Sequence, residues 1–311
     1  MRTLFYNMPG FEALAKTIAK KLNIKKGVYQ LKRFTNNEAQ IVISDDVKNS
    51  KCLVLGTNVP PDQRTIELMF LCHTLKKEGA QKISAVLPYL AYTRQDRKEA
   101  KKSLAMDWFA KTFKISGVSE IITLDIHSQL AQKLFDMPLI SLSPAKIFAD
   151  EIKKISFIDA TIIAPDEGAI NRCQDVKKYL GIKEPISYFK KKRNGQKISS
   201  VFKGKAKKRV ILIDDILDTG GTLIIACKEL KKLGVHEIII MVTHGLFTND
   251  NWKELWDLGV KKIYTTDSLP LVARNSREAG FPDIEVKKIT SSGISILPVA
   301  PVIEKYFKIK K

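Results

Sequence analysis

The sequence predicts an α/β protein of two similar domains, each a mainly parallel sheet flanked by helices. Short apolar runs alternate with amphipathic stretches, which is the pattern of repeated parallel α/β units. Gly79, Gly117 and Gly234 stand where helix C-caps are expected, each shortly before a strand-like run. The length of 311 residues suits about two domains.

The expected elements follow in chain order. Strands are expected where short runs are rich in Val and Ile, at Ala39–Ile43, Lys51–Gly56, Lys82–Pro88, Glu120–Asp125, Thr161–Pro165, Arg209–Asp214, Glu237–Thr243 and Lys262–Thr266. Helices are expected where apolar residues recur at helical spacing, at Phe11–Leu22, Arg64–Glu78, Ala105–Ile115, Pro144–Ile155 and Thr222–Leu233.

A repeated segment indicates how the chain divides into domains. The helix–glycine–strand segment Leu75–Ile83 recurs in similar form as Leu230–Ile238. Such an echo favours a duplicated α/β domain, although αβ units can resemble each other without duplication. We expect one domain over residues 1–145 and a second over residues 146–311, with the last helix a candidate to pack back on the N-terminal half.

Composition excludes several classes of protein. Hydrophobic residues make up 44% and charged residues 28%, as in a globular domain with a sizeable core. No stretch approaches the ~20 apolar residues of a membrane span, and the first residues lack the apolar core of a signal peptide. The four cysteines are scattered without a C-x-x-C pair. We therefore expect a cytoplasmic protein with no membrane segment, disulfide framework or zinc site.

The net charge of +20 raises the hypothesis of nucleic-acid binding. However, the lysines are spread along the chain as short pairs, and no basic arm or basic–aromatic interleaving accompanies them. We expect no nucleic-acid partner and interpret the lysines as a solvated surface that also attracts small polyanions.

The strongest chemical signal is the segment Arg209–Thr222. An apolar strand delivers two adjacent carboxylates, Asp214 and Asp215, where ligands bind in open α/β sheets. A loop of small and polar residues then leads into a helix and could close its N–H groups around a phosphate: Asp218, Thr219, Gly220, Gly221 and Thr222. The pattern predicts a site that holds vicinal sugar hydroxyls and a sugar phosphate. An acidic strand end followed by a capped helix is the alternative.

Further polar segments follow other predicted strands. Leu87–Lys98 combines aromatic side chains with Arg94, Gln95, Asp96 and Arg97, and could stack on an adenine and neutralise a polyphosphate. A charged surface turn is the alternative. His127 and Asp166 each come at the end of a strand, although a lone histidine there is more often structural than a ligand.

These segments carry a resemblance to known enzymes. Arg209–Thr222 resembles the phosphoribosyl-diphosphate signature shared by phosphoribosyltransferases and ribose-phosphate pyrophosphokinases. Leu87–Lys98 is similar to the ATP-contacting segment of the second family, and Asp125–His127 and Pro165–Gly168 are similar to its D-L-H and P-D-x-G elements. The chain is identified as a member of the ribose-phosphate pyrophosphokinase family, which implies two phosphoribosyltransferase-like domains.

The resemblance also implies a reaction. ATP and ribose 5-phosphate would give AMP and 5-phospho-α-D-ribose 1-diphosphate, for nucleotide biosynthesis, with Mg²⁺ as cofactor. It implies a homo-oligomer whose active site lies at a subunit interface, because the Arg33–Glu38 loop would contact ATP bound to a neighbouring subunit.

The roles of individual residues follow from the resemblance. ATP would contact Phe34, Asn36, Glu38, Arg94, Gln95, Asp96 and His127. Ribose 5-phosphate would contact Asp166, Asp214, Asp215, Asp218, Thr219, Gly220, Gly221 and Thr222. Mg²⁺ would contact His127 and Asp166, and the catalytic cations on a strand-like flap would be Lys191 and Arg193, with Lys190 or Lys192 as substitutes for Lys191.

Three other functions stay open from the residues. A phosphoribosyltransferase would consume the diphosphate and would not need the Arg94 or His127 segments. A silent regulatory homologue would have no reason to keep the paired aspartates and His127. A nucleic-acid-binding protein has only the net charge in its favour. In addition, Val47–Ser50 lacks the Arg-Gly of the common bacterial type, which puts that type's ADP inhibition and phosphate activation in doubt.

Overall fold

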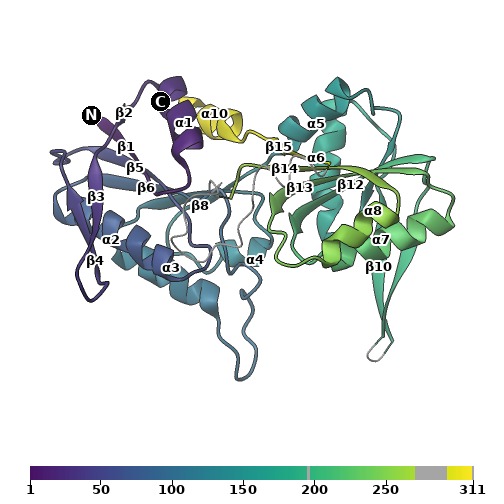
Figure 1. The fold of residues 1–311 in the computed structure, drawn as a ribbon, viewed down its shortest axis with the longest axis horizontal. Coiled ribbons are helices and arrows are strands. Elements are labelled where there is room, and N and C mark those ends of the chain that lie inside the picture. The colour runs from purple at the N-terminus through teal and green to yellow at the C-terminus, as the bar shows by residue number, and fades with distance from the viewer. Residues whose placement is uncertain (195–196, 270–292, 310–311) are drawn as a thin grey trace. The chain divides into compact units, whose positions relative to one another are not determined.

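The computed structural model describes residues 1–194, 197–269 and 293–309, with the backbone alone for Gln129 and residues 191–194 and 197–199. The chain forms two compact units, coloured from purple to teal and from teal to green in Figure 1. The first unit comprises Met1–Leu142 and the C-terminal helix, and the second runs from Ser143 to Asp267 and includes the last strand. The division therefore falls between Leu142 and Ser143.

The first unit is a parallel six-stranded sheet in the order β2-β1-β5-β6-β7-β8. Its strands are β1 (Thr3–Asn7), β2 (Lys25–Lys26), β5 (Lys51–Leu55), β6 (Lys82–Val86), β7 (Glu120–Leu124) and β8 (Leu139–Leu142). Its helices are α1 (Glu12–Leu22), α2 (Gln63–Lys77), α3 (Ala105–Ile115), the short α4 (Gln129–Gln132) and α10 (Ala300–Ile309). Figure 1 shows α1 and α10 on one face and α2 and α3 on the other.

Two features extend this first unit. Strands β3 (Tyr29–Arg33) and β4 (Ala39–Ile43) form a separate antiparallel hairpin that packs on α2. Helix α10, at the end of the chain, packs against α1, and Lys21 Nζ lies 3.0 Å from Glu304 Oε2.

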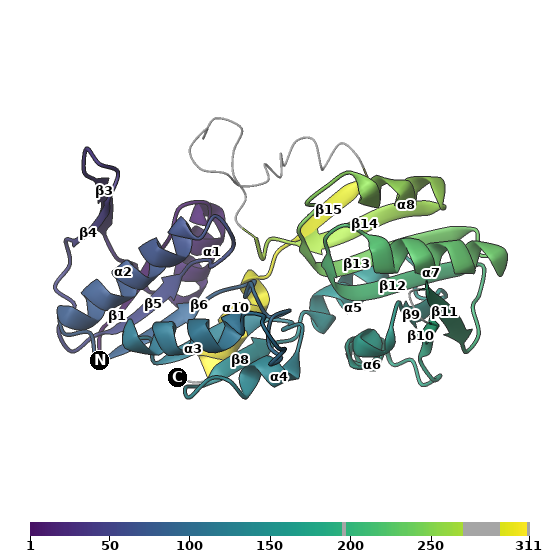
Figure 2. The same cartoon turned by 90° about the horizontal axis from the view of Figure 1, so that it is seen from below.

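The second unit is a seven-stranded sheet in the order β11-β10-β9-β12-β13-β14-β15. Its strands are β9 (Thr161–Ala164), β10 (Ser187–Asn194), β11 (Lys197–Lys203), β12 (Arg209–Leu217), β13 (Glu237–Gly245), β14 (Val260–Thr266) and β15 (Ile294–Leu297). All pairs are parallel except the antiparallel β10–β11 hairpin. Helices α5 (Ala145–Lys154) and α6 (Ile170–Leu180) cover one face, and α7 (Gly221–Lys232) and α8 (Glu254–Asp257) cover the other (Figure 2).

Burial on both faces explains why β12 reads as a continuous apolar run. Its alternate side chains enter two separate cores: Leu212 shares one with Leu223 of α7, and Ile213 shares the other with Phe148 of α5. A strand covered on both faces needs apolar residues at every position rather than at every second one. The predicted α/β class with mainly parallel sheets and flanking helices is confirmed. No described helix combines the length and apolar character that crossing a membrane requires.

Asp267 connects the ends of two neighbouring strands in the second unit. It follows β14, and its Oδ1 accepts a hydrogen bond from the N–H of Val299 at 2.7 Å. Its own N–H donates to the carbonyl of Leu297 at 3.1 Å. Burial raises the pKa of Asp267 to about 6, although the two N–H donors favour the charged form.

This raised pKa predicts how stability depends on pH. Between the ordinary value of 3.8 and about 6, the folded chain holds a proton on Asp267 that the unfolded chain has lost. Stability therefore falls as the pH rises through this window. Asp267→Asn keeps an acceptor for Val299 and carries no charge, so thermal unfolding should match the parent near pH 4 and occur a few degrees higher above pH 6. Asp175→Asn, at an exposed position of α6, is the control. Parallel pH profiles for parent and D267N would contradict the assignment.

Candidate active site

Two adjacent carboxylates lie in the buried end of β12. Asp214 and Asp215 are 8% and 6% exposed. The expected end of this strand at Asp214 is wrong, because Ile216 and Leu217 still pair with β13, opposite His244 and Gly245. The two acids therefore belong to the strand itself, which fixes their backbone more firmly than a loop would.

Arg172 of α6 bridges the two carboxylates. Its Nη1 lies 3.7 Å from Asp214 Oδ1 and its Nη2 lies 3.6 Å from Asp215 Oδ2. Burial raises the pKa of Asp214 well above its usual range, and the charge of Asp215 raises it further, whereas Arg172 lowers it. One guanidinium thus only partly offsets two buried acids, and the site favours a ligand that donates hydrogen bonds or brings positive charge.

Sequence reasoning missed Arg172 because it did not predict α6. This helix carries Lys, Asp, Gln, Asn and Arg over most of its length, so its apolar stripe is narrow. A signal was nevertheless present, since Arg172 lies in the first turn of the helix that follows β9 and Asp166.

Asp166 joins the same acidic cluster. It follows β9, which pairs with β12 through Ile163 and Leu212, so the two strands bring their carboxyl ends together. Its Oδ1 accepts a hydrogen bond from the N–H of Gly168 at 3.0 Å, and its charge contributes to the raised pKa of Asp214. Asp166 therefore adds negative charge near the Asp214–Asp215 pair, which one guanidinium only partly offsets, and this charge suits a cation or hydroxyl donors.

A tight loop connects β12 to the N-terminus of α7. Gly220 adopts a left-handed conformation with φ of 84°, and the helix begins at Gly221. Thr248, which follows β13, donates its hydroxyl to Asp218 Oδ1 and holds the start of the loop. Helix N-terminal N–H groups beside small residues can bind an anion, and the phosphate site expected at Asp218–Thr222 stays a prediction.

The open space beside this loop has a different character. A pocket of about 500 Å³ borders Thr219 and Gly221, and three acids but one lysine line it: Asp250, which pairs with Lys253, Glu254, which pairs with Lys228, and Asp257. Its charge does not match that of a phosphate. The case for a phosphate site therefore rests on the loop backbone and the helix N-terminus, and not on this pocket.

The same substitution should have a large effect at one loop glycine and a small effect at the other. A Cβ at Gly220 would lie 3.0 Å from the backbone of Trp252 and would be forced into a left-handed conformation, whereas at Gly221 it would meet only Thr219 Oγ1 at 4.0 Å. Gly220→Ala should therefore lower the free energy of unfolding by about 1–3 kcal/mol. Gly221→Ala should leave it within about 0.5 kcal/mol. Urea denaturation of both variants measures the difference, and equal losses would contradict it.

The first unit places the polar segments after β6 and β7 at one edge of its sheet. These strands are parallel neighbours, so Arg94, Gln95 and Asp96 after β6 and His127 after β7 lie at the same end. Arg94, Gln95 and His127 are exposed, whereas Asp96 is 9% exposed. Gln95 Oε1 accepts a hydrogen bond from the hydroxyl of Ser103 at 2.8 Å.

Asn58 fixes the Arg94 segment from the next strand along the sheet. This fully buried side chain follows β5; its Nδ2 donates to the carbonyl of Ala91 at 3.3 Å, and its Oδ1 accepts from the N–H of Ala91 at 3.0 Å. The ring of Tyr92 lies 4.6 Å from that of Phe109 between centroids. The backbone before Arg94 is thus held, while Arg94 and Gln95 face solvent.

The β3–β4 hairpin presents the remaining nucleotide candidates. The N–H of Phe34 donates to the carbonyl of Glu38 at 3.0 Å, and Asn36 Oδ1 accepts from the N–H of Glu38 at 3.2 Å. The loop is therefore ordered by its own hydrogen bonds, and the ring of Phe34 is 54% exposed. Arg33 forms an ion pair with Glu67, which ties the hairpin to α2.

The flap candidates lie on the β10–β11 hairpin. Lys191 and Arg193 are on β10, opposite Ser200 and Ile198 of β11. The neighbouring Lys190 has its Nζ 3.7 Å from Glu167 Oε1, beside the segment that contains Asp166. The predicted flap is therefore a two-stranded extension of the sheet, next to the strand that leads to the acidic cluster.

Comparison with known proteins shows to which family the chain belongs. Residues 4–117 match the N-terminal domain of ribose phosphate pyrophosphokinase, and residues 131–268 match the phosphoribosyl transferase domain. The ribose-phosphate pyrophosphokinase of Bacillus caldolyticus is 32% identical over 263 residues, which cover 83% of each chain. The chain belongs to the ribose-phosphate pyrophosphokinase family.

A further relative agrees with this membership, and a solved structure shares the fold. The family member of Campylobacter jejuni is 28% identical over 279 residues, covering 89% of this chain and 88% of its own. The crystal structure of phosphoribosylpyrophosphate synthetase from Mycobacterium smegmatis has the same fold, with a TM-score of 0.82 at 24% identity over 99% of this chain and 98% of that one. The family assignment favours a phosphoribosyl diphosphate synthetase over a phosphoribosyltransferase, because the N-terminal domain of this family is present as well.

Proposed function

We propose that this chain is a ribose-phosphate diphosphokinase, which transfers the diphosphoryl group of ATP to the 1-hydroxyl of ribose 5-phosphate. The hydroxyl oxygen attacks the β-phosphorus, the bond from that phosphorus to the α-phosphate oxygen breaks, and AMP leaves. The observation that carries the proposal is the pair of buried carboxylates beside a glycine-containing loop, in a chain of this family. The product supplies nucleotide biosynthesis.

Ribose 5-phosphate would occupy the second unit. Asp214 and Asp215 would accept hydrogen bonds from its vicinal hydroxyls, and Arg172 would hold both acceptors in position. The backbone of Asp218–Thr222 and the N-terminus of α7 would bind the phosphate. A sugar that donates two hydrogen bonds suits two acids that one guanidinium only partly neutralises.

ATP would be held by the first unit. Arg94 and His127 are exposed at one sheet edge and could bind phosphate oxygens. Gln95, Asp96, Phe34, Asn36 and Glu38 complete the proposed nucleotide contacts, with the exposed ring of Phe34 available to stack on an adenine.

Transfer itself would depend on position and charge. Phosphoryl transfer needs little covalent chemistry from a protein and gains mainly from alignment and neutralisation of the transferring group. Lys191 and Arg193 of the β10–β11 hairpin are the proposed cations for that charge.

The residues fit a divalent cation, and we propose Mg²⁺. Asp214, Asp215 and the nearby Asp166 leave negative charge at the proposed sugar site, and oxygen ligands suit Mg²⁺. Among the described residues, no three His, Cys, Asp or Glu side chains form a cage for an ion. The ion would therefore be held largely by phosphate oxygens, with Asp166 and His127 as its protein contacts, and would neutralise phosphate charge when bound.

A homo-oligomer with a shared active site is part of the proposal. Phe34 at the tip of the β3–β4 hairpin is half-exposed, and Ile66 and Phe70, one turn apart on α2, are 50% and 45% exposed. Apolar surface gathered on a helix and an adjacent hairpin is typical of an interface. A second copy on this surface would lie beside the loop that carries Phe34, Asn36 and Glu38.

The decisive experiment measures AMP release from ATP, Mg²⁺ and ribose 5-phosphate. AMP and phosphoribosyl diphosphate should form in equal amounts, and omission of the sugar phosphate or the metal should abolish both. Repetition with inorganic phosphate and with ADP tests regulation. Release of inorganic phosphate without the diphosphate product would overturn the proposal.

The flap cations give a separate prediction. Lys191→Ala removes a charge that stabilises the transition state and not the bound substrates, so kcat should fall by about 10²–10³ while both KM values change little. Lys203→Ala, an exposed lysine on the other strand of the hairpin, is the control and should keep normal turnover. Near-normal kcat in K191A would move the role to Lys190 or Lys192.

A further inference from the structure

A second pocket lies in the second unit, at the opposite end of the sheet from the acidic cluster. Its volume is about 700 Å³, within the range of small-molecule sites. Thr161, the first residue of β9, and Ser187, the first residue of β10, lie on its wall, together with the segment 204–207 between β11 and β12. The acidic cluster follows the other ends of β9 and β12, so no proposed site residue lines this pocket.

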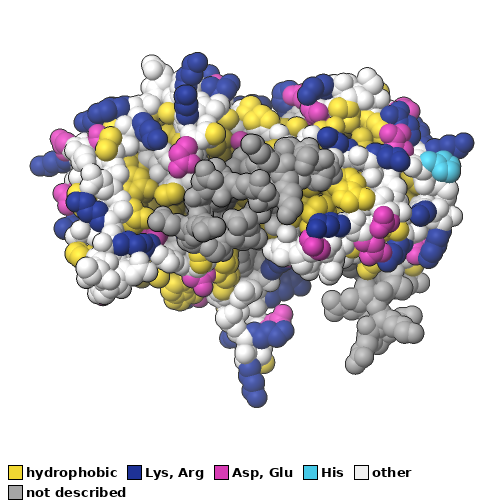
Figure 3. Space-filling view, in the orientation of Figure 1, with side chains coloured by type: hydrophobic (Ala, Val, Ile, Leu, Met, Phe, Trp, Pro, Cys, Tyr) yellow, Lys and Arg dark blue, Asp and Glu magenta, His cyan; other side chains and the backbone are white. Residues whose placement is uncertain are grey.

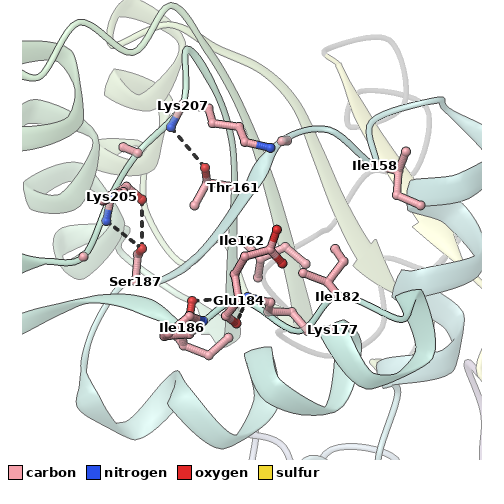
Figure 4. A pocket seen from close by; sticks show the side chains of 14 residues that line it. Ile158, Thr161, Ile162, Lys177, Ile182, Glu184, Ile186, Ser187, Lys205 and Lys207 are labelled. Carbon is pink, nitrogen blue, oxygen red and sulfur yellow. Dashed lines mark hydrogen bonds between the residues drawn. The ribbon is translucent and has the colours of Figure 1, made fainter.

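The lining has an apolar side and a basic side. Ile158, Ile162, Ile182 and Ile186 supply most of the apolar wall. Figure 4 shows Ile182 and Ile186 on one side and Lys205 and Lys207 on the other. Such a cavity matches a ligand with an apolar body and a charged end.

The charges in the wall favour an anion. Lys177, which is 6% exposed, donates from Nζ to the carbonyl of Pro185 at 3.2 Å and to that of Glu184, and its charge also lies close enough to Glu184 to interact with that carboxylate. Glu184 is therefore balanced by Lys177. Among the described residues, Lys205 and Lys207 form no ion pair, and Lys207 Nζ has only the carbonyl of Asp159 at 2.9 Å. Two cations remain for the charged end of a ligand.

The same pocket is lined by the residues from which the β10–β11 hairpin leaves the sheet, Ser187, Gly204 and Lys205, which we call the root of the hairpin. Ser187 Oγ donates to the carbonyl of Lys205 at 2.8 Å and accepts from its N–H at 3.1 Å, which closes the hairpin where it leaves the sheet. Gly204 adopts φ of 115° there, and a Cβ would come within 2.4 Å of Ser187 Oγ. A ligand in the pocket would therefore touch the two segments from which the hairpin extends.

The hairpin has little other support from the sheet. Only Ser187 and Tyr188 pair with β9, and the rest of β10 pairs with β11 alone. Figure 1 shows the hairpin extending from the body of the second unit. Phe189 of β10 is fully buried in the core beside α7, so the hairpin is held at its start, and the part beyond Phe189 takes its orientation from there.

We propose that this pocket binds a small anion with an apolar, ring-sized body, and that the bound anion restrains the root of the β10–β11 hairpin. The second half rests on the proposed function, since the hairpin carries Lys191 and Arg193. Occupancy would change the turnover of ATP and ribose 5-phosphate without competing with either substrate.

Binding is tested on the full chain with anilinonaphthalene sulfonate, an apolar ring system with one sulfonate whose fluorescence rises in apolar sites. One saturable site per chain is expected, and ATP with ribose 5-phosphate should not displace the probe. Lys205→Glu should weaken binding about tenfold or more, because it replaces attraction with repulsion. Lys203→Glu, an exposed lysine outside the pocket, is the matched control. Equal affinity in the two variants, or displacement by the substrates, would overturn the site.

A second variant keeps the test independent of charge. Ile158→Trp enlarges a half-exposed side chain of the pocket wall and should abolish probe binding while the thermal unfolding midpoint stays near that of the parent. If this variant binds the probe as the parent does, the pocket is not the site.

Kinetic measurements with the probe test whether the bound anion restrains the hairpin. In the parent, saturating probe should lower kcat and leave both KM values unchanged, whereas Lys205→Glu should need about tenfold more probe or more for the same effect. Saturated binding with unaltered kcat would refute the restraint of the hairpin. A chain that releases no AMP at all would refute the proposed function, while the fluorescence experiment would still decide the site.

Discussion

The second unit depends on keeping two adjacent carboxylates buried at the end of a central strand. Asp214 and Asp215 lose most of their hydration, and Arg172 returns only part of that loss. Their placement requires a strand that is covered on both faces and a helix, α6, that delivers the guanidinium to them. The folded chain keeps this unfavourable arrangement because two large apolar cores, one on each face of the sheet, outweigh it.

Parallel connectivity explains why residues distant in sequence meet. Every parallel strand ends at the same edge, so the loops after β9 and β12 in the second unit, and after β5, β6 and β7 in the first, each converge. This rule let the sequence predict the fold class, helix Ala105–Ile115 and the positions of the acidic and glycine-containing segments. To apply this rule, the sequence has only to show where strands and helices alternate, and the spacing of buried apolar residues shows this directly.

Contacts that cross between elements could not be predicted in this way. The two hydrogen bonds between Asn58 and Ala91 join segments 33 residues apart, and no local pattern distinguishes Asn58 from any other polar loop residue. Arg172 was missed for a related reason: the polar sequence of α6 hides its narrow apolar stripe. The strand was predicted to end at Asp214 because charged residues usually follow the last residue of a strand, whereas here they are buried within β12.

The large positive charge acts over longer distances than any of these contacts. Figure 3 shows lysine and arginine side chains scattered over the visible face and interspersed with acids, rather than gathered in one patch. Scattered charge gives no docking surface of defined shape, but a net charge of +20 still raises the potential around the chain. The net charge therefore raises the rate at which anionic substrates meet the protein, and salt at physiological concentration screens this attraction beyond about 8 Å. Specific recognition must come from the loops at the strand ends, where backbone N–H groups and a few fixed side chains act at contact distance, and there salt screens much less.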